Sequence, residues 1–126
     1  MDELVRWLGV QLDEDERIAR AVQWEGSGNR LSWELAASAT VDVGEDEFYA
    51  GDRTIANHIV THDPARVLRE IDAKRRIIAE VVPEARKAEA MIHEEWGSGS
   101  DTAGDLLRLL ALPYADRPGY KESWRP

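Results

Sequence analysis

The chain has 126 residues, and its 25 acidic and 16 basic side chains give a formal net charge of −9. This negative surplus argues against general binding to nucleic acids or anionic membranes, because contacts to phosphates require Lys and Arg. The absence of cysteine excludes disulfides, thiolate nucleophiles and cysteine-ligated zinc sites.

A chain of this length predicts a single domain, 1–126, with one hydrophobic core. We expect no integral membrane protein, because no apolar run approaches the ~18 residues of a membrane-spanning helix. The opening MDELVRWLG is acidic where a secretory signal would be basic. These features together predict a cytoplasmic protein.

The first predicted element is an amphipathic helix over residues 2–23, where apolar residues recur with the helical period. Its acidic run from Asp13 to Glu16 is interpreted as a solvated face with ion pairs such as Glu16 to Arg20.

A β-meander is predicted at about 30–50, after a Gly-rich turn. Leu31, Trp33 and Leu35 alternate with polar residues, which indicates a strand with one buried face. Two further short strands are expected at 40–43 and 48–49. Because short strands alone are marginal in water, we expect the helices to cover their apolar face.

Two predicted helices meet between His62 and Asp63. The first, about 53–62, has Asp52 as its N-cap, and the second, about 64–82, has Asp63 as N-cap and Pro64 in its first turn. The predicted buried stripe of the second helix comprises Val67, Leu68, Ile71, Ile78, Val81 and Val82. Pro83 is expected either to kink this helix or to open a new one.

The remaining chain predicts two more helices and a strap. Residues 84–96 favour a helix with an apolar stripe of Ala85, Ala88, Ile92 and Trp96. A Gly-Ser loop follows, and then a helix at about 102–112, capped by Asp101 or Thr102, whose leucines are dense enough to be buried on most sides. An extended C-terminal strap, 113–126, is expected to be anchored by Tyr114, Tyr120 and Trp124. The predicted fold class is α+β and mainly helical, with a small antiparallel β-sheet packed against about four helices.

Three histidines are candidate metal ligands. His58 and His62 are four residues apart on a predicted helix, which is the usual first half of a metal site, and His93 could join them only through the fold. The general-base glutamate of a metalloprotease motif is missing between them. The alternative is structural, with His62 favoured by the dipole at a helix C-terminus and His58 packing as a partly buried polar residue.

A basic patch is the second candidate site, with four arginines suited to binding phosphate or carboxylate: Arg66, Arg69, Arg75 and Arg76. The interspersed acidic residues favour a solvated face that is ion-paired to the first helix instead. No nucleophile with a neighbouring base and no cofactor motif stands out. The five tryptophans are interpreted mainly as core residues, and a ligand pocket or interface is the alternative.

Three segments carry a resemblance to a known family: LVRWLGVQLDEDERIARA, HIVTHDPARVLREIDAKRRI and LRLLALPYADRPGYKESW. These segments make up about half of the chain, and in them the sequence resembles the domain of unknown function 6221 family of actinobacterial chromosomes and phages. The resemblance implies little about activity, because the family has no assigned biochemical function. Many members resemble zinc proteins between the second and third segments. This chain has instead a cysteine-free helix and loop from Glu84 to Ser100, so a zinc site is not carried over, and we expect the helix to replace the metal structurally.

The functional hypothesis is a non-catalytic accessory protein that binds another protein through an apolar or acidic surface. The alternative is a metal-binding, possibly hydrolytic, protein using His58 and His62. A third option, an acidic mimic of nucleic acid, is disfavoured by the interspersed arginines. A homo-oligomer is left open.

Overall fold

The computed structural model describes residues 2–126, which form two compact units. The first unit comprises the described residues up to Asp13 together with Asp72–Pro126, and the second is Glu14–Ile71. The fold is mainly helical with one small antiparallel sheet, which confirms the predicted α+β class. The single domain expected from the chain length stays a prediction.

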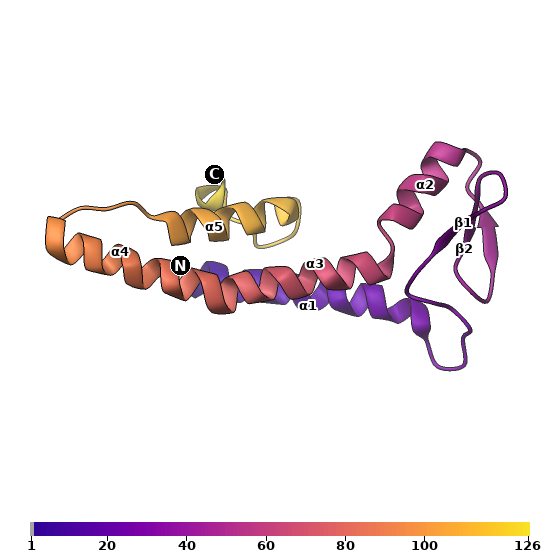
Figure 1. Cartoon of the computed structure of the whole chain (residues 1–126), viewed down its shortest axis with the longest axis horizontal. Coiled ribbons are helices and arrows are strands. Elements are labelled where there is room, and N and C mark those ends of the chain that lie inside the picture. The colour runs from indigo at the N-terminus through magenta and orange to yellow at the C-terminus, as the bar shows by residue number, and fades with distance from the viewer. Residues whose placement is uncertain (1) are drawn as a thin grey trace. The chain divides into compact units, whose positions relative to one another are not determined.

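The second unit contains the antiparallel sheet. Its strands lie in the order β1 (Glu34–Ala36), β2 (Thr40–Asp42) and β3 (Glu47–Tyr49), and helix α2 (Arg53–Thr61) packs on β1 and β2 (Figure 1). Val41 and Ala56 are fully buried between the sheet and the helix. The predicted N-cap forms, because Asp52 Oδ1 accepts hydrogen bonds from the first turn of α2.

Strand β1 is shorter than the alternation from Leu31 to Leu35 predicted. The backbone before it bonds elsewhere: Trp33 N donates to Asp63 Oδ2 at 3.0 Å, and Leu31 O accepts from Ala65 N at 2.9 Å. Asp63 Oδ1 also accepts from Arg66 N, so this buried carboxylate caps the next helix and holds the loop before β1. Leu31 O and Trp33 N are therefore bonded outside the sheet and do not extend the β1 ladder.

The chain continues as helix α3 (Pro64–Arg76), a π-helical segment (Ile77–Val81) and helix α4 (Val82–Trp96). The break expected at Pro83 takes the form of this π segment, in which Val82 N donates to Ile77 O. Pro83 has no N–H, and its ring would collide with the carbonyl four residues earlier in a regular α-helix. The wider π turn accommodates the proline and lets the helix run on.

The first unit is built on the N-terminal part of helix α1 (Asp2–Arg20), whose Leu4, Leu8 and Leu12 are buried. Helix α5 (Thr102–Ala111) packs against α4 (Figure 1). Asp101 caps α5 by accepting from Gly104 N, and Glu89 Oε1 of α4 accepts from Ala103 N at 3.1 Å.

The C-terminal residues of the first unit contact α1 through aromatic side chains. Trp7 Nε1 donates to Pro118 O at 3.1 Å, and the Trp7 ring lies 5.7 Å from that of Tyr120 and 5.4 Å from that of Trp124. Gly119 has a φ of +88°, and a Cβ there would lie 2.7 Å from Trp7 Nε1. The strap can therefore follow this path only with glycine at 119.

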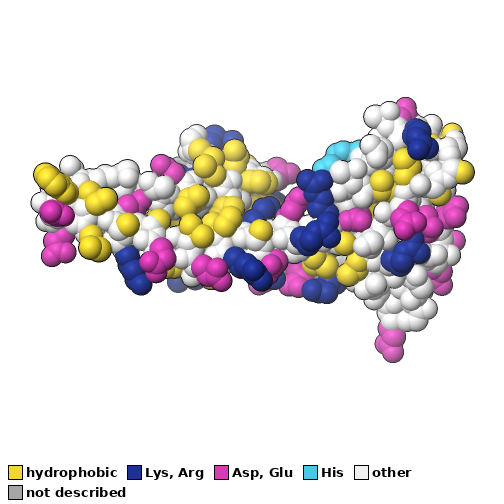
Figure 2. Space-filling model, in the orientation of Figure 1, with side chains coloured by type: hydrophobic (Ala, Val, Ile, Leu, Met, Phe, Trp, Pro, Cys, Tyr) yellow, Lys and Arg dark blue, Asp and Glu magenta, His cyan; other side chains and the backbone are white. Residues whose placement is uncertain are grey.

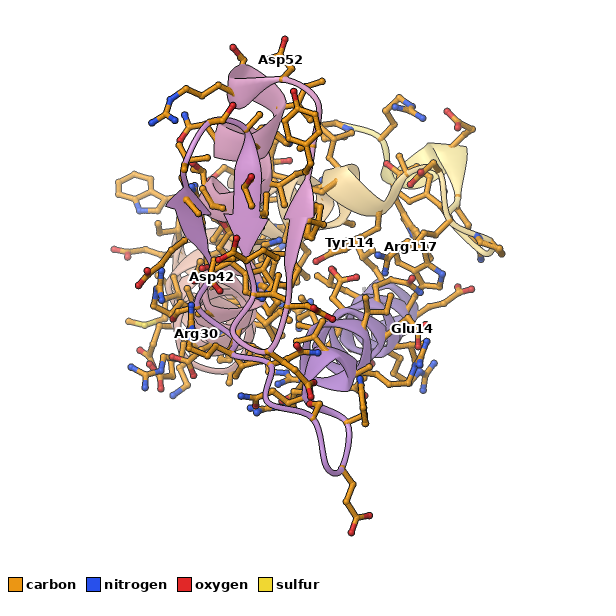
Figure 3. The ribbon with its side chains drawn as sticks, turned by 90° about the vertical axis from the view of Figure 1, so that its right-hand side faces the viewer. Glu14, Arg30, Asp42, Asp52, Tyr114 and Arg117 are labelled. Carbon is orange, nitrogen blue, oxygen red and sulfur yellow. The ribbon has the colours of Figure 1, made fainter. Side chains whose placement is uncertain are left out.

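Tyr114 is a second, buried anchor of this strap. The guanidinium of Arg117 lies 4.7 Å from the centroid of the Tyr114 ring (Figure 3), and Lys74 Nζ is 3.2 Å from the Tyr114 hydroxyl. Arg117 also donates to the backbone oxygen of Gln11 on α1. The chain from residue 2 to 126 contains no helix that is both long and apolar enough to cross a membrane.

Candidate interaction surface

The histidine pair lies on the exposed side of α2. The rings of His58 and His62 are 4.3 Å apart between centroids, and His62 Nδ1 is 2.9 Å from His58 O. Because a carbonyl oxygen only accepts, this hydrogen bond requires a proton on His62 Nδ1. The pair thus offers ring nitrogens to solvent from one helix.

The third histidine belongs to the other unit. His93 is on α4, and its backbone oxygen accepts the Gly97 N–H that ends the helix. Within residues 2–126, no three His, Cys, Asp or Glu side chains form a group that could hold a metal ion. The metal site at His58, His62 and His93 stays a prediction.

The basic patch is largely ion-paired. Arg66 Nε lies 2.9 Å from Glu70, Arg76 Nε lies 3.2 Å from Asp72, and Arg75 Nη2 lies 2.8 Å from Asp13 of α1. Arg69 is exposed on the same helix. Exposed pairs of this kind contribute about 0–1 kcal/mol each, so the patch behaves mainly as a solvated, neutralised surface. Its role as an interaction surface stays a prediction.

The carboxylates with lowered pKa also belong to exposed ion pairs. A hydrogen bond from Lys121 lowers the pKa of Glu3, and one from Arg125 lowers the pKa of Glu122. Catalytic groups usually combine a shifted pKa with burial in a cleft, and both of these carboxylates are at the surface. The shift of Glu3 therefore reflects the ion pair between α1 and the strap, and the shift of Glu122 reflects an ion pair within the strap.

A shallow pocket of about 380 Å³ lies in the second unit. Its lining residues are Leu35, Arg53, Thr54 and Asn57. Arg53 Nη1 already donates to Ser38 O at 2.7 Å. The Arg30–Asp42 pair, with 3.4 Å between the charged groups, belongs to the same unit (Figure 3). The pocket lining contains no carboxylate, histidine or strong nucleophile, so it offers no acid–base chemistry.

The most distinctive surface of the first unit is apolar. Trp96 is 74% exposed, Met91 69% and Ile92 49%, all on the C-terminal half of α4. Ala88 and Val81 are also exposed. We call five residues the α4 apolar face: Ala88, Met91, Ile92 and Trp96 of α4, and Val81 of the π segment that immediately precedes it. Figure 2 shows hydrophobic side chains over α4 and α5 on the side that it presents.

Several exposed apolar residues, on this surface and elsewhere, were predicted to be buried. The interpretation of the tryptophans as core residues was wrong for Trp96, and also for Trp24, which is exposed near the end of α1. The predicted burial of Val81 was also wrong, because the π segment shifts the register of the helix around this residue and leaves it exposed. Leu109 and Leu112 are exposed because α5 packs through one face: Ala103, Gly104, Leu107 and Ala111.

The sequence contained a signal for this surface. The stripe Ala85, Ala88, Ile92 and Trp96 was predicted, but helical periodicity does not say whether the chain itself supplies a cover. In the structure Ala85 is half-buried, and the other three are exposed.

Comparison with known proteins identifies a family. A family model described as "Family of unknown function (DUF6221)" matches residues 1–126. No match was found among curated proteins or among solved structures.

Proposed function

Because the chain belongs to a family of unknown function, DUF6221, its role has to be inferred from its surface, and we propose that it is a non-catalytic accessory protein that binds another protein. The observation that carries this proposal is the exposure of Trp96, Met91 and Ile92 together on α4. Contiguous exposed apolar side chains are characteristic of protein-binding sites, and Trp and Met are enriched there.

The energetics of association favour such a role. Trp can bury about 200 Å² of surface, so covering Trp96 and its neighbours would stabilise a complex by several kcal/mol before the entropic cost of association. Trp is also among the residues most often found at the energetic centre of interfaces. The exposed ion pairs described above lack the burial that catalysis usually requires, which further supports a binding role.

Site-specific photocrosslinking in cells that produce the chain tests this proposal. A photoreactive phenylalanine analogue replaces Ile92 in one variant and Ala90 in the other. The two positions lie on opposite sides of α4, because residues two apart on a helix do not share a face. We expect a discrete protein adduct from position 92 that is lost when Trp96 is changed to Ser. No adduct from position 92, or the same adduct from position 90, would contradict the proposal.

A further inference from the structure

We propose that the partner of the α4 apolar face is a basic amphipathic helix of another protein. This inference rests on the proposed binding function and names the chemistry of the ligand. Two properties of the surface carry it: the shape of the apolar stripe and the charge of its rim.

The stripe has the length and spacing that a helix would match. Val81, Ala88, Ile92 and Trp96 are separated by seven, four and four residues, and all four are exposed. A stripe of this span is about 22 Å long at 1.5 Å per residue, which corresponds to about four helical turns. Helix-in-groove recognition uses anchors at this spacing, and the small side chain of Ala88 at the middle permits close approach.

The rim of the stripe is acidic. Glu95 follows Ile92 by three residues and Met91 by four, so it lies on the same side of α4 as the stripe. Glu94 follows Met91 by three residues and is two residues from both Ile92 and Trp96, so it borders the stripe at Met91 only. Glu80 precedes Val81 at the other end. Across the described part of the chain, these three exposed carboxylates have no ion-pair partner, whereas the nearby Glu84 is neutralised by Lys87 at 3.3 Å.

The position of Glu94 and Glu95 makes their charge unfavourable in the isolated chain. Both lie in the last turn of α4, which ends at Gly97 in a left-handed conformation with a φ of +76°. The helix dipole places partial negative charge at this end and favours cations there by about 0.3–1 kcal/mol. Lys or Arg side chains of a bound helix would pair with these carboxylates and relieve the repulsion.

The same rim argues against a second copy of this chain as the occupant. If two α4 helices paired in parallel, Glu94 and Glu95 would face their own copies. If they paired antiparallel about Ala88, Glu95 would face Glu80 and Glu84 of the other copy. Like charges opposed across an interface are destabilising in either orientation, whereas a basic helix is complementary to the unpaired carboxylates at both ends of the stripe.

Two designed peptides of about 18 residues, or five helical turns, test the inference. Both carry Leu at helical spacing on one face, and one carries Lys and the other Glu along its flanks. Binding of the fluorescein-labelled peptides to the whole chain is measured by fluorescence anisotropy. We expect the Lys peptide to bind at least about tenfold more tightly than the Glu peptide, and added salt to reduce the difference.

Three variants separate the contributions. Glu94→Lys/Glu95→Lys should remove the preference for the Lys peptide. Glu25→Lys/Glu47→Lys makes the same change in net charge at exposed positions of the second unit and should preserve it. Ile92→Ser/Trp96→Ser should weaken binding of the Lys peptide at least about tenfold, because the apolar anchors are lost.

Each other outcome overturns the inference in a distinguishable way. Equal binding of both peptides, lost in Ile92→Ser/Trp96→Ser, would refute the basic partner and leave the proposed function standing. A preference removed equally by Glu25→Lys/Glu47→Lys would show attraction to net charge alone. Binding of neither peptide refutes the basic helix, and the crosslinking experiment then decides the proposed function separately. Concentration-dependent dimerisation through Trp96 in sedimentation would identify a second copy as the occupant.

Discussion

Replacing Gly119 by Ala should destabilise the first unit more than replacing Gly97 by Ala, although both glycines have a positive φ. Gly119 has a φ of +88°, and an added Cβ would lie 2.7 Å from Trp7 Nε1. Gly97 has a φ of +76° and nothing within 4 Å of its Cβ position, so Gly97→Ala is the matched control.

The magnitude follows from the contacts of Trp7. An L-residue in the left-handed region costs about 1–2 kcal/mol, which both variants share. Gly119→Ala must also move the indole, which weakens its hydrogen bond to Pro118 O, worth about 1 kcal/mol. Two aromatic contacts, to Tyr120 and Trp124, contribute about 0.5–1.5 kcal/mol each. We expect Gly119→Ala to lower the free energy of unfolding by about 2 kcal/mol more than Gly97→Ala.

Urea denaturation followed by far-ultraviolet circular dichroism measures the difference without relying on Trp fluorescence. Combining Gly119→Ala with Trp7→Phe completes the test, because phenylalanine lacks the Nε1 atom that the new Cβ would meet. The extra destabilisation should largely disappear in that background. Equal effects of Gly119→Ala and Gly97→Ala, or an undiminished effect beside Trp7→Phe, would refute this account of the strap.

Three further predictions concern two single contacts and the histidine pair. Asp63→Ala should destabilise the second unit by about 2–3 kcal/mol in urea, because two backbone N–H groups lose their acceptor, whereas Asp63→Asn should lose less; equal effects would contradict this role. Lys121→Met should raise the pKa of Glu3 toward its ordinary value in an NMR titration, while Lys121→Arg should keep it low. Because the pKa of Glu3 is lowered in the folded state, this pair stabilises above the unfolded value of 4.5 and is lost as pH falls through the folded pKa, so Lys121→Met should reduce that acid sensitivity. A chelator should leave the melting temperature unchanged, and stoichiometric metal bound through His58 and His62 would instead favour the metal hypothesis.

Local chemistry made some of the fold predictable from the sequence. Asp52 and Asp63 cap the helices that they were expected to cap, and of the two candidates Asp101 and Thr102 it is Asp101 that caps α5. These caps are predictable because a capping carboxylate bonds within three residues of itself. The fold class was predictable because hydrophobic periodicity is also a local property of the sequence.

The missed features depend on distant partners. The hydrogen bond from Trp33 N to Asp63 Oδ2 joins residues thirty positions apart in the sequence. It makes β1 shorter than the alternation of apolar and polar residues predicts. The contact of Gly119 with Trp7 is likewise invisible in the local pattern. The exposure of Trp96 was missed because an amphipathic period indicates an apolar face but not what covers it.

The central claim is that the α4 apolar face is the binding surface, and the indole N–H signals of the protein test it most directly. In ¹⁵N spectra, the Lys-flanked peptide should shift the Trp96 indole signal and leave that of Trp24 unchanged, although both side chains are exposed. Buried Trp124 serves as a second internal reference. A shift confined to Trp96 is the predicted result, and a shift of Trp24 with Trp96 unmoved would contradict the account.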